Sequence, residues 1–225
     1  GFTAATPVSV GVNPIAIEVG DLDGDNDLDL VVANFNDNTV STLFNDGSGS
    51  YTVSTYPTDA GPSTIAIGNY VEDGLMLDDL AVGCIGGSPT TVSVLQNQST
   101  LPLRGSSFSW MNSINVPTPA DIKPGDVNHD KDLDYVILDR ASNTVVVYYG
   151  NGNGASTAGF TYASNLPAGS GPIDQAFGDL NNDGYNDLLT VNNLGGTISI
   201  IRGNINDFDL PSSISVGTLP EALVI

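Results

Sequence analysis

Residues 14–45 read PIAIEVGDLDGDNDLDLVVANFNDNTVSTLFN and contain the pattern that decides the fold. A proline opens a short apolar segment at residues 15–17, a loop of alternating aspartates follows at 21–29, and two further apolar segments lie at 30–33 and 40–44. Short segments rich in Val, Ile and Thr between turn residues are typical of β-strands. The stretch therefore predicts short antiparallel strands joined by tight turns.

The same pattern occurs four times along the chain. The acidic loops, numbered here loop 1 to loop 4, lie at residues 21–29, 69–79, 126–134 and 179–187. A proline stands seven residues before each loop, and each unit also contains an aromatic residue that opens a further strand segment, at Phe2, Tyr51, Phe108 and Phe160. Four short strands in a unit of about 50 residues are typical of a propeller blade, because each blade needs its neighbours to cover its apolar faces. The sequence predicts an all-β fold, a β-propeller of four-stranded antiparallel blades, with residues 1–225 as one domain.

The repeats do not end evenly. Phe208 and Pro220 stand 12 residues apart, as Phe2 and Pro14 do, so a fifth unit begins before the last residue. The pattern thus predicts four full repeats with half-repeats at both ends. Either the sequence is a segment of a larger propeller, or another chain completes the half-repeats. In the second case, unpaired strands at residues 2–10 and 221–225 would pair with a neighbouring copy and form a homo-oligomer, such as a filament or shell.

Oxygen-bearing side chains stand at positions 1, 3, 5, 7 and 9 of loops 1, 3 and 4. They are Asp21, Asp23, Asp25, Asp27 and Asp29; Asp126, Asn128, Asp130, Asp132 and Asp134; and Asp179, Asn181, Asp183, Tyr185 and Asp187. Alternate side chains of a tightly curled segment can point to one centre, and Ca²⁺ takes six to eight such hard oxygen ligands. At position 7 the residue type varies, which indicates that the backbone carbonyl is the ligand there. The residue at position 6 is expected in a left-handed backbone conformation.

Two alternatives apply to these loops. An EF-hand is excluded because position 12 holds Val32, Ile137 or Thr190 in place of its bidentate Glu. Solvated turns also favour Asp, Asn and Gly, but three loops that share a five-position register favour a metal site. Loop 2 departs from the pattern, since it lacks an oxygen side chain at position 3 and has two extra residues. Its candidate ligands are Asn69, Asp73 and Asp79, with Glu72 or Asp78 as substitutes, and a fourth Ca²⁺ site is left open.

Composition limits the partners and the chemistry. Five Lys and Arg against 26 Asp and Glu give a net charge of −21, which disfavours nucleic acid and anionic membranes. No apolar run approaches the roughly 20 residues of a membrane helix, so membrane insertion is not expected. His129 and Cys84 are single and have no nucleophile motif, so a non-enzymatic protein is predicted. A polysaccharide lyase is the enzymatic alternative, and Lys123 and Arg140 are its candidate cations. Asn97 begins a glycosylation sequon at a predicted turn.

The repeating unit resembles a known family. Its form is Pro-x-x-Ile-Ala-x-Gly-Asp, acidic loop, Asp-Leu, apolar strand, Asn-x-x-Gly-x-Gly-x-Phe/Tyr, with the sequences SGP at 170–172 and AFGD at 176–179. This unit is similar to the FG-GAP/VCBS repeat of integrin α-subunit propellers and of many secreted surface proteins. The resemblance implies Ca²⁺ in the loops between the first two strands of each blade. It also implies an extracellular or cell-surface location and a role in adhesion or in binding a protein or glycan ligand.

Overall fold

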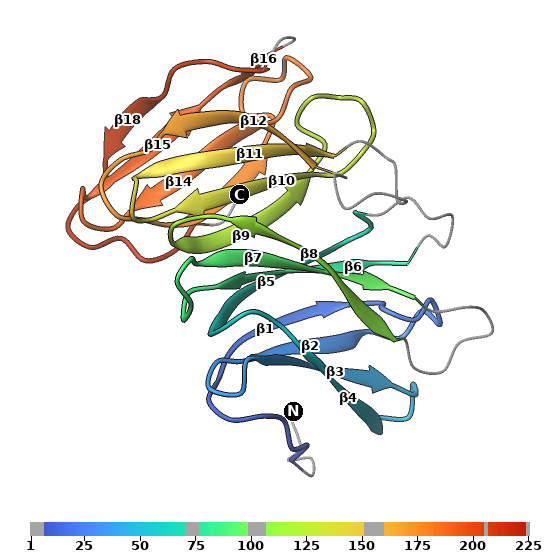
Figure 1. Ribbon diagram of the computed structural model, residues 1–225. Coiled ribbons are helices and arrows are strands. Elements are labelled where there is room, and N and C mark those ends of the chain that lie inside the picture. Colours follow the sequence, from blue (N-terminus) through green and yellow to red (C-terminus); the bar gives the residue numbers. More distant parts are fainter. Residues whose placement is uncertain (1–6, 71–76, 99–106, 151–159, 205–206, 224–225) are drawn as a thin grey trace, which may run out of the picture.

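The computed structural model describes residues 7–70, 77–98, 107–150, 160–204 and 207–223. Within these ranges the chain forms four four-stranded antiparallel sheets and one two-stranded sheet, and it contains no helix (Figure 1). No described segment is therefore a helix long and apolar enough to cross a membrane. The all-β fold class and the four strands per repeat are confirmed.

The sheets follow one another along the chain. Sheet 1 contains β1 (Pro14–Gly20), β2 (Asp29–Asn34), β3 (Thr39–Asn45) and β4 (Tyr51–Pro57). Sheet 2 contains β5 (Pro62–Gly68), β6 (Asp79–Cys84), β7 (Thr91–Asn97) and β8 (Phe108–Asn115). Sheet 3 contains β9 (Pro119–Gly125), β10 (Asp134–Asp139), β11 (Thr144–Gly150) and β12 (Phe160–Pro167). Sheet 4 contains β13 (Pro172–Gly178), β14 (Asp187–Asn192), β15 (Thr197–Ile201) and β18 (Ser212–Ser215).

Each sheet is an antiparallel meander, in which every strand pairs with the next one along the chain. The second strand lies between the first and the third, so that Val32 pairs with Ile17 on one side and with Ser41 on the other. Side chains alternate between the two faces of a strand. In sheets 2 and 3 the second strand is buried along its whole length, because other sheets cover both of its faces.

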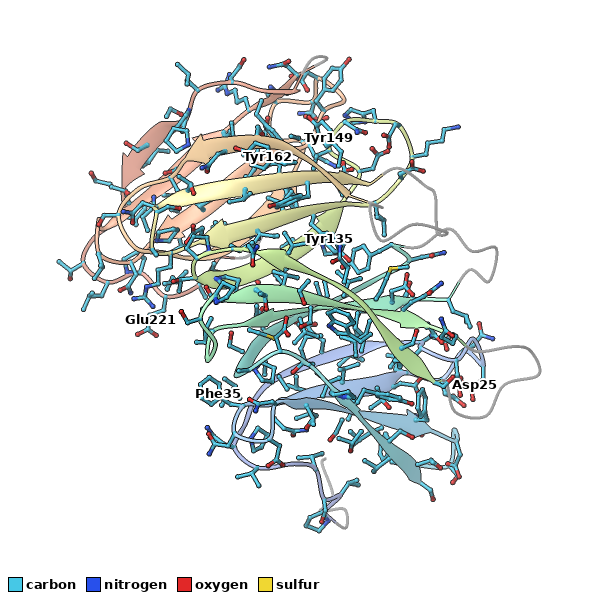
Figure 2. The ribbon with its side chains drawn as sticks, in the orientation of Figure 1. Asp25, Phe35, Tyr135, Tyr149, Tyr162 and Glu221 are labelled. Carbon is cyan, nitrogen blue, oxygen red and sulfur yellow. The ribbon has the colours of Figure 1, made fainter. Side chains whose placement is uncertain are left out.

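The sheets pack face to face and share three apolar cores. Between sheets 1 and 2, Val31 packs in one cluster with Leu80. Tyr135, labelled in Figure 2, lies in the core between sheets 2 and 3. Between sheets 3 and 4, Val136 packs in one cluster with Leu188. The first strands also meet in series, β1 with β5, β5 with β9 and β9 with β13. Every acidic loop joins a first strand to a second strand, so the loops lie at one end of successive sheets.

The two ends differ from the prediction. The fourth strand of sheet 4 does not begin at Phe208, because the β16 (Gly203–Asn204) and β17 (Asp207–Phe208) hairpin intervenes before β18. The described parts of the predicted end strands, residues 7–10 and 221–223, are not strands, so the predicted half-repeats are wrong over these residues. The physical reason is that a local hairpin completes every sheet with its own fourth strand. Side chains hold the end segments instead, since Asn34 Oδ1 accepts a hydrogen bond from Gly11 N and Asp174 Oδ2 accepts one from Leu223 N.

Candidate metal centre

The last aspartate of each loop has the same hydrogen bonds in all four repeats. These closing aspartates, Asp29, Asp79, Asp134 and Asp187, are at most 2% exposed. One carboxylate oxygen accepts the backbone N–H of loop position 2, with distances of 2.9, 3.0, 2.7 and 3.1 Å in chain order. The other oxygen accepts the N–H of the residue that ends the third-strand segment, Asn45, Asn97, Gly150 or Gly203, at 2.8 to 3.0 Å. Each closing aspartate therefore joins its loop to the end of the third strand, at the open end of the hairpin formed by the second and third strands.

The first aspartate organises the curl of the loop. In loops 1, 3 and 4 it accepts the N–H of position 6, with Asn26, Lys131 and Gly184 as donors at 3.0, 3.1 and 2.9 Å. These three donors have φ angles of 70°, 82° and 91°. The predicted left-handed conformation at position 6 is confirmed, and it includes Lys131, although this conformation is costly for a residue with a Cβ.

A third repeated bond fixes the middle of the loop. The carboxylate at position 5 accepts the N–H of position 7 at 2.9 Å in loops 1, 3 and 4, where Asp25, Asp130 and Asp183 are the acceptors. These bonds hold the carboxylates in place in the loops as they stand. The loops would therefore lose little conformational entropy when a ligand binds, because these hydrogen bonds already fix their backbone.

Loop 1 brings three carboxylates together. Oxygens of Asp21, Asp23 and Asp29 lie within 4.8 Å of one another, and Asp23 and Asp29 are 2% and 0% exposed. The pKa of Asp29 is raised to about 6, mainly by burial and in smaller part by the charges of Asp23 and Asp25, while the N–H groups of Asn45 and Leu22 lower it. Three carboxylates this close together, two of them buried, form a compact set of hard oxygen ligands that fits Ca²⁺.

Loops 3 and 4 use a different donor set. Their position 3 is asparagine, and its amide nitrogen donates to the position-5 carboxylate, from Asn128 to Asp130 at 2.9 Å and from Asn181 to Asp183 at 2.8 Å. In loop 3 the second oxygen of Asp126, Oδ1, is buried and has no hydrogen-bond partner among the described residues. This oxygen fits a cation ligand. Burial also raises the pKa of Asp134 to about 6, with a further contribution from the charge of Asp130.

Loop 2 is described only at its two ends. Asp73 and Glu72, two of its candidate ligands, lie outside the described residues. Asn69 Oδ1 is buried without a hydrogen-bond partner in the described part of the chain. Burial raises the pKa of Asp78, and the charge of Asp21 in loop 1 raises it further. Loops 1 and 2 are therefore electrostatically coupled.

The position-7 side chains have other neighbours. A Cβ on Gly47 would collide with the carboxylate of Asp27, so this side chain lies against the turn between β3 and β4. The Tyr185 ring makes an edge contact with His129 of loop 3, with 4.9 Å between the ring centroids. These contacts agree with a backbone ligand at position 7. Tyr185 connects loops 3 and 4.

The repeat pattern did not indicate one buried acid. Asp121 of β9 is 9% exposed, and its Oδ2 has no hydrogen-bond partner among the described residues. Burial raises the pKa of Asp121 to about 6, while Lys123 lowers it and Asp174 raises it. Lys123 Nζ lies 3.8 Å from Asp121 Oδ1, so one of the two candidate lyase cations already faces a carboxylate. The equivalent positions are Ala16 in sheet 1, Thr64 in sheet 2 and Asp174 in sheet 4, so an acid occurs here in two of the four repeats.

The glycosylation sequon is inaccessible in the folded chain. Asn97 is 1% exposed, and its Nδ2 donates to Leu22 O at 2.8 Å and to Asp78 O at 3.1 Å. Asn97 is the last residue of β7, and its side chain joins sheet 2 to loop 1, which leaves no room for a glycan.

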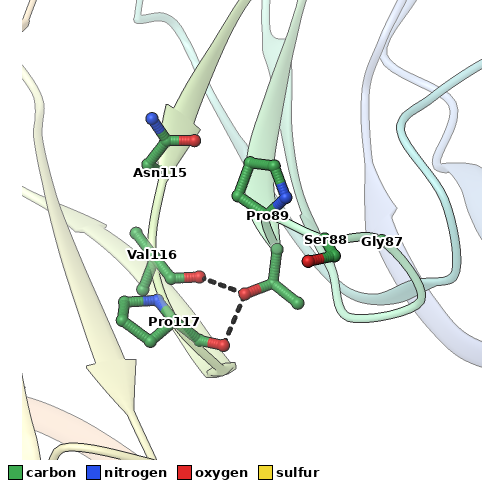
Figure 3. Close-up of a pocket in the computed structure, with 7 residues that line it drawn as sticks. Gly87, Ser88, Pro89, Asn115, Val116 and Pro117 are labelled. Carbon is green, nitrogen blue, oxygen red and sulfur yellow. Dashed lines mark hydrogen bonds between the residues drawn. The ribbon is translucent and has the colours of Figure 1, made fainter.

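A cavity of about 460 Å³ lies beside the turn between β6 and β7 (Figure 3). Its lining residues are Gly87, Ser88, Pro89, Thr90, Asn115, Val116 and Pro117. Thr90 Oγ1 donates to the carbonyl oxygens of Val116 and Pro117, which closes one side of the cavity. No ionisable side chain lines it, so its chemistry is poorer than that of the acidic loops.

Comparisons with known proteins agree with the repeat pattern. Residues 126–190 match the family model of the FG-GAP-like repeat. No curated protein matches the sequence. One similar solved structure is a functionally unknown protein from Desulfotomaculum acetoxidans DSM 771, with a TM-score of 0.67 and 14% identity, over 97% of this chain and 61% of that one. Another is BBS1N in complex with ARL6DN, soaked with lead, with a TM-score of 0.61 and 16% identity, over 95% of this chain and 59% of that one.

Both structural similarities concern the fold alone, because identity is low. The chain spans about three fifths of the length of each of these two proteins. The family match begins at the first residue of loop 3 and ends within β14, so it covers loop 3, β10 to β13 and loop 4 but not the first strand of sheet 3. Over residues 126–190 the chain is therefore similar to the FG-GAP-like repeat family.

Proposed function

We propose that the chain is a calcium-stabilised, non-enzymatic module of a β-propeller, exposed outside the cell, which binds a protein or glycan partner. The observation that carries the proposal is the carboxylate cluster of loop 1, where Asp21, Asp23 and Asp29 meet with two of them buried. Carboxylates held this close repel one another, and a divalent cation removes the repulsion. Loops 3 and 4 repeat the same backbone scaffold, which supports three sites. The buried Asn69 oxygen, which has no hydrogen-bond partner among the residues that the structure describes, supports a fourth in loop 2.

The serial contact of the first strands supports the propeller arrangement. In Figure 1 the four sheets follow one another through the molecule, and the first strands of successive sheets are in contact, β1 with β5, β5 with β9 and β9 with β13. Repeated sheets stacked in this way are typical of propeller blades. The repeat family supports an extracellular binding role by analogy. The fold alone does not specify this role, because propellers perform many unrelated tasks.

Calorimetric titration of the metal-free chain with Ca²⁺ tests the metal assignment. We expect about three equivalents to bind and the melting temperature to rise with free Ca²⁺, because a ligand that binds only the folded state stabilises it by mass action. Asp23→Ala should remove one equivalent. Asp23→Asn should weaken that site by about tenfold, because an oxygen ligand remains while one charge is lost.

Glu221→Gln is the matched control for these variants. It removes one exposed carboxylate outside the loops and should leave the binding isotherm unchanged. If Ca²⁺ produces neither binding heat nor a shift in melting temperature, the calcium assignment is wrong.

Two exposed aromatic residues are the places where we expect a glycan to stack. Trp110 in β8 and Tyr162 in β12 are each 54% exposed and occupy equivalent positions in sheets 2 and 3. Aromatic side chains that are partly exposed to solvent are common at binding surfaces. Trp110 is the only tryptophan, so its fluorescence reports binding directly. If Trp110 and Tyr162 stack on the same ligand, neutral oligosaccharides should shift the Trp110 fluorescence of the natural chain. The same oligosaccharides should leave the fluorescence of the Tyr162→Ala variant unchanged. An unchanged spectrum would favour a protein partner.

Incubation with acidic polysaccharides tests the non-enzymatic assignment. We expect no chain cleavage, because the described cations are few and Lys123 faces Asp121. Cleavage that disappears in Lys123→Ala or Arg140→Ala would show that the protein is a lyase.

A further inference from the structure

The internal interfaces show what covers each kind of sheet face. The front face of a sheet is defined here as the one that packs on the preceding sheet, and the back face as the one that packs on the following sheet. Each of the three cores joins the back face of one sheet to the front face of the next. The front face of sheet 1 and the back face of sheet 4 have no such neighbour in the described chain.

The front face of sheet 1 is more exposed than its equivalents. Ile17 in β1 is 58% exposed, whereas Ile65, Ile122 and Gln175 at the same position are 3%, 1% and 1% exposed. Val19, on the same face, is 53% exposed. A position that is covered in the three following sheets, twice with isoleucine and once with glutamine, is therefore open at this end with an isoleucine.

Leu30 in β2 shows the same difference on this front face. It is half-buried, whereas its equivalents Leu80, Tyr135 and Leu188 are fully buried.

The back face of sheet 4 is the matching half of the interface. Leu180, at position 2 of loop 4, is 45% exposed, whereas the equivalent Leu22, Tyr70 and Val127 are 0%, 6% and 6% exposed. In β15, Ile198 is half-buried, although Val40, Val92 and Val145 at the same position are fully buried.

A polar group of the interface is also present at the open end. Inside the chain, Asn97 at the end of β7 donates to the carbonyl of Leu22 in the preceding loop at 2.8 Å and to its own loop at Asp78 O. Asn45 is the equivalent residue of sheet 1, and it already donates to its own loop at Leu28 O, at 3.3 Å. The repeat register therefore places Asn45 to bond the carbonyl of a position-2 residue from another sheet.

We propose that the front face of sheet 1 binds the back face of sheet 4 of a second copy of this chain, head to tail. The open faces carry the two halves of an interface that the chain makes three times internally, so the occupant that fits each face is the other face. Ile17 of one copy then packs near Leu180 of the other, and Asn45 bonds its carbonyl. Two different surfaces meet, so the contact closes into a ring or extends as a filament, depending on the rotation between copies. The contact does not depend on calcium in the loops.

Sedimentation velocity of the full chain over a range of concentrations tests this contact. Each copy has a net charge of −21, so the measurement is made with salt and Ca²⁺, which screen the repulsion. We expect dimers or longer head-to-tail assemblies. Ile17→Asp and Leu180→Asp should each weaken association by about tenfold or more, because each places a charge in an apolar contact.

Mixing the two variants gives the sharper test. A copy with Ile17→Asp retains its back face and a copy with Leu180→Asp retains its front face, so the mixture should form a heterodimer although each variant alone does not associate. Val53→Asp is the control, since Val53 is 39% exposed and its equivalents Trp110 and Tyr162 stay exposed in the covered sheets. Unfolding in urea verifies that the variants are folded. Monomers of the natural chain at every concentration, or no rescue on mixing, would overturn the proposal.

Discussion

Asn34 and Asn192 form the same hydrogen bonds in sheets 1 and 4. Each side chain accepts a glycine N–H at 3.1 Å and donates to a serine hydroxyl at 2.9 Å. Sheet 2 has Cys84 at this position, 1% exposed, and the polar group comes from Asp59 in the preceding connection instead. Asp59 Oδ2 accepts the hydroxyls of Thr91 at 2.7 Å and Ser113 at 2.5 Å. In sheet 2 the polar group therefore lies on the connection before β5, at Asp59, and not on the second strand.

This exchange predicts strong coupling between two substitutions. Asp59→Gly leaves two hydroxyls without their acceptor, and Cys84→Asn forces an amide against the Asp59 carboxylate, so each should destabilise the chain by about 1–3 kcal/mol. The double variant restores the arrangement of sheets 1 and 4. Its loss in free energy of unfolding should be smaller than the sum of the two single losses, by about 1 kcal/mol or more. Urea unfolding of the four proteins measures this coupling, and simple additivity would contradict it.

Asp121 predicts a pH dependence of stability. Its pKa is about 6 in the folded chain against 3.8 ordinarily, because burial disfavours the charged form. The folded chain therefore binds this proton more tightly, and the free energy of unfolding falls as the pH rises through this interval. Lys123 and Asp174 are the charges that face it, with opposite effects. Asp121→Asn should abolish a fall on the order of 2 kcal/mol. Urea unfolding with Ca²⁺ present measures it, and equal pH profiles for both chains would refute the assignment.

At the scale of the element, the hairpin of the second and third strands depends on the closing aspartate. Asp79 accepts Tyr70 N–H at 3.0 Å and Asn97 N–H at 2.8 Å, and it is 2% exposed. Asp79→Ala leaves two N–H groups without this acceptor and should destabilise the chain by about 2–5 kcal/mol. The loss should persist in chelator, because both donors to Asp79 are backbone N–H groups of the chain itself. Thermal unfolding with and without Ca²⁺ measures this, and Asp27→Ala is the control. A loss only with Ca²⁺ would assign Asp79 a purely metal-binding role.

At the scale of the whole molecule, the stacking of sheets predicts a gradient of local stability. Within the described residues, sheets 2 and 3 pack against another sheet on both faces, whereas sheets 1 and 4 each pack against one other sheet. In a stack of repeats, stability is close to a sum of units and nearest-neighbour interfaces. Amide hydrogen exchange should therefore be slowest in β6 and β10 and faster in β2 and β14. Head-to-tail association should slow exchange in β2 and β14. Uniform exchange across the four sheets of the monomer would contradict the gradient.

Much of the fold and of the candidate site could be predicted from local spacing. The prolines, acidic loops and alternating apolar segments recur at similar offsets, and strand order within a sheet follows because each hairpin joins neighbours in the chain. The left-handed turn at Lys131 also follows from its position in the loop. These features depend on a few consecutive residues, so the sequence alone determines them.

Only the tertiary structure decided the rest. The closing aspartate Asp29 accepts the N–H of Asn45, and Asn97 of sheet 2 donates to the carbonyl of Leu22 in loop 1. Ile17 and Ile65 have the same identity and register but differ in exposure by 55 percentage points, 58% against 3%. A repeated sequence determines what each side chain is, whereas burial depends on which sheet lies opposite. That arrangement arises only when the sheets stack, because apolar area must be removed from water by a neighbouring surface.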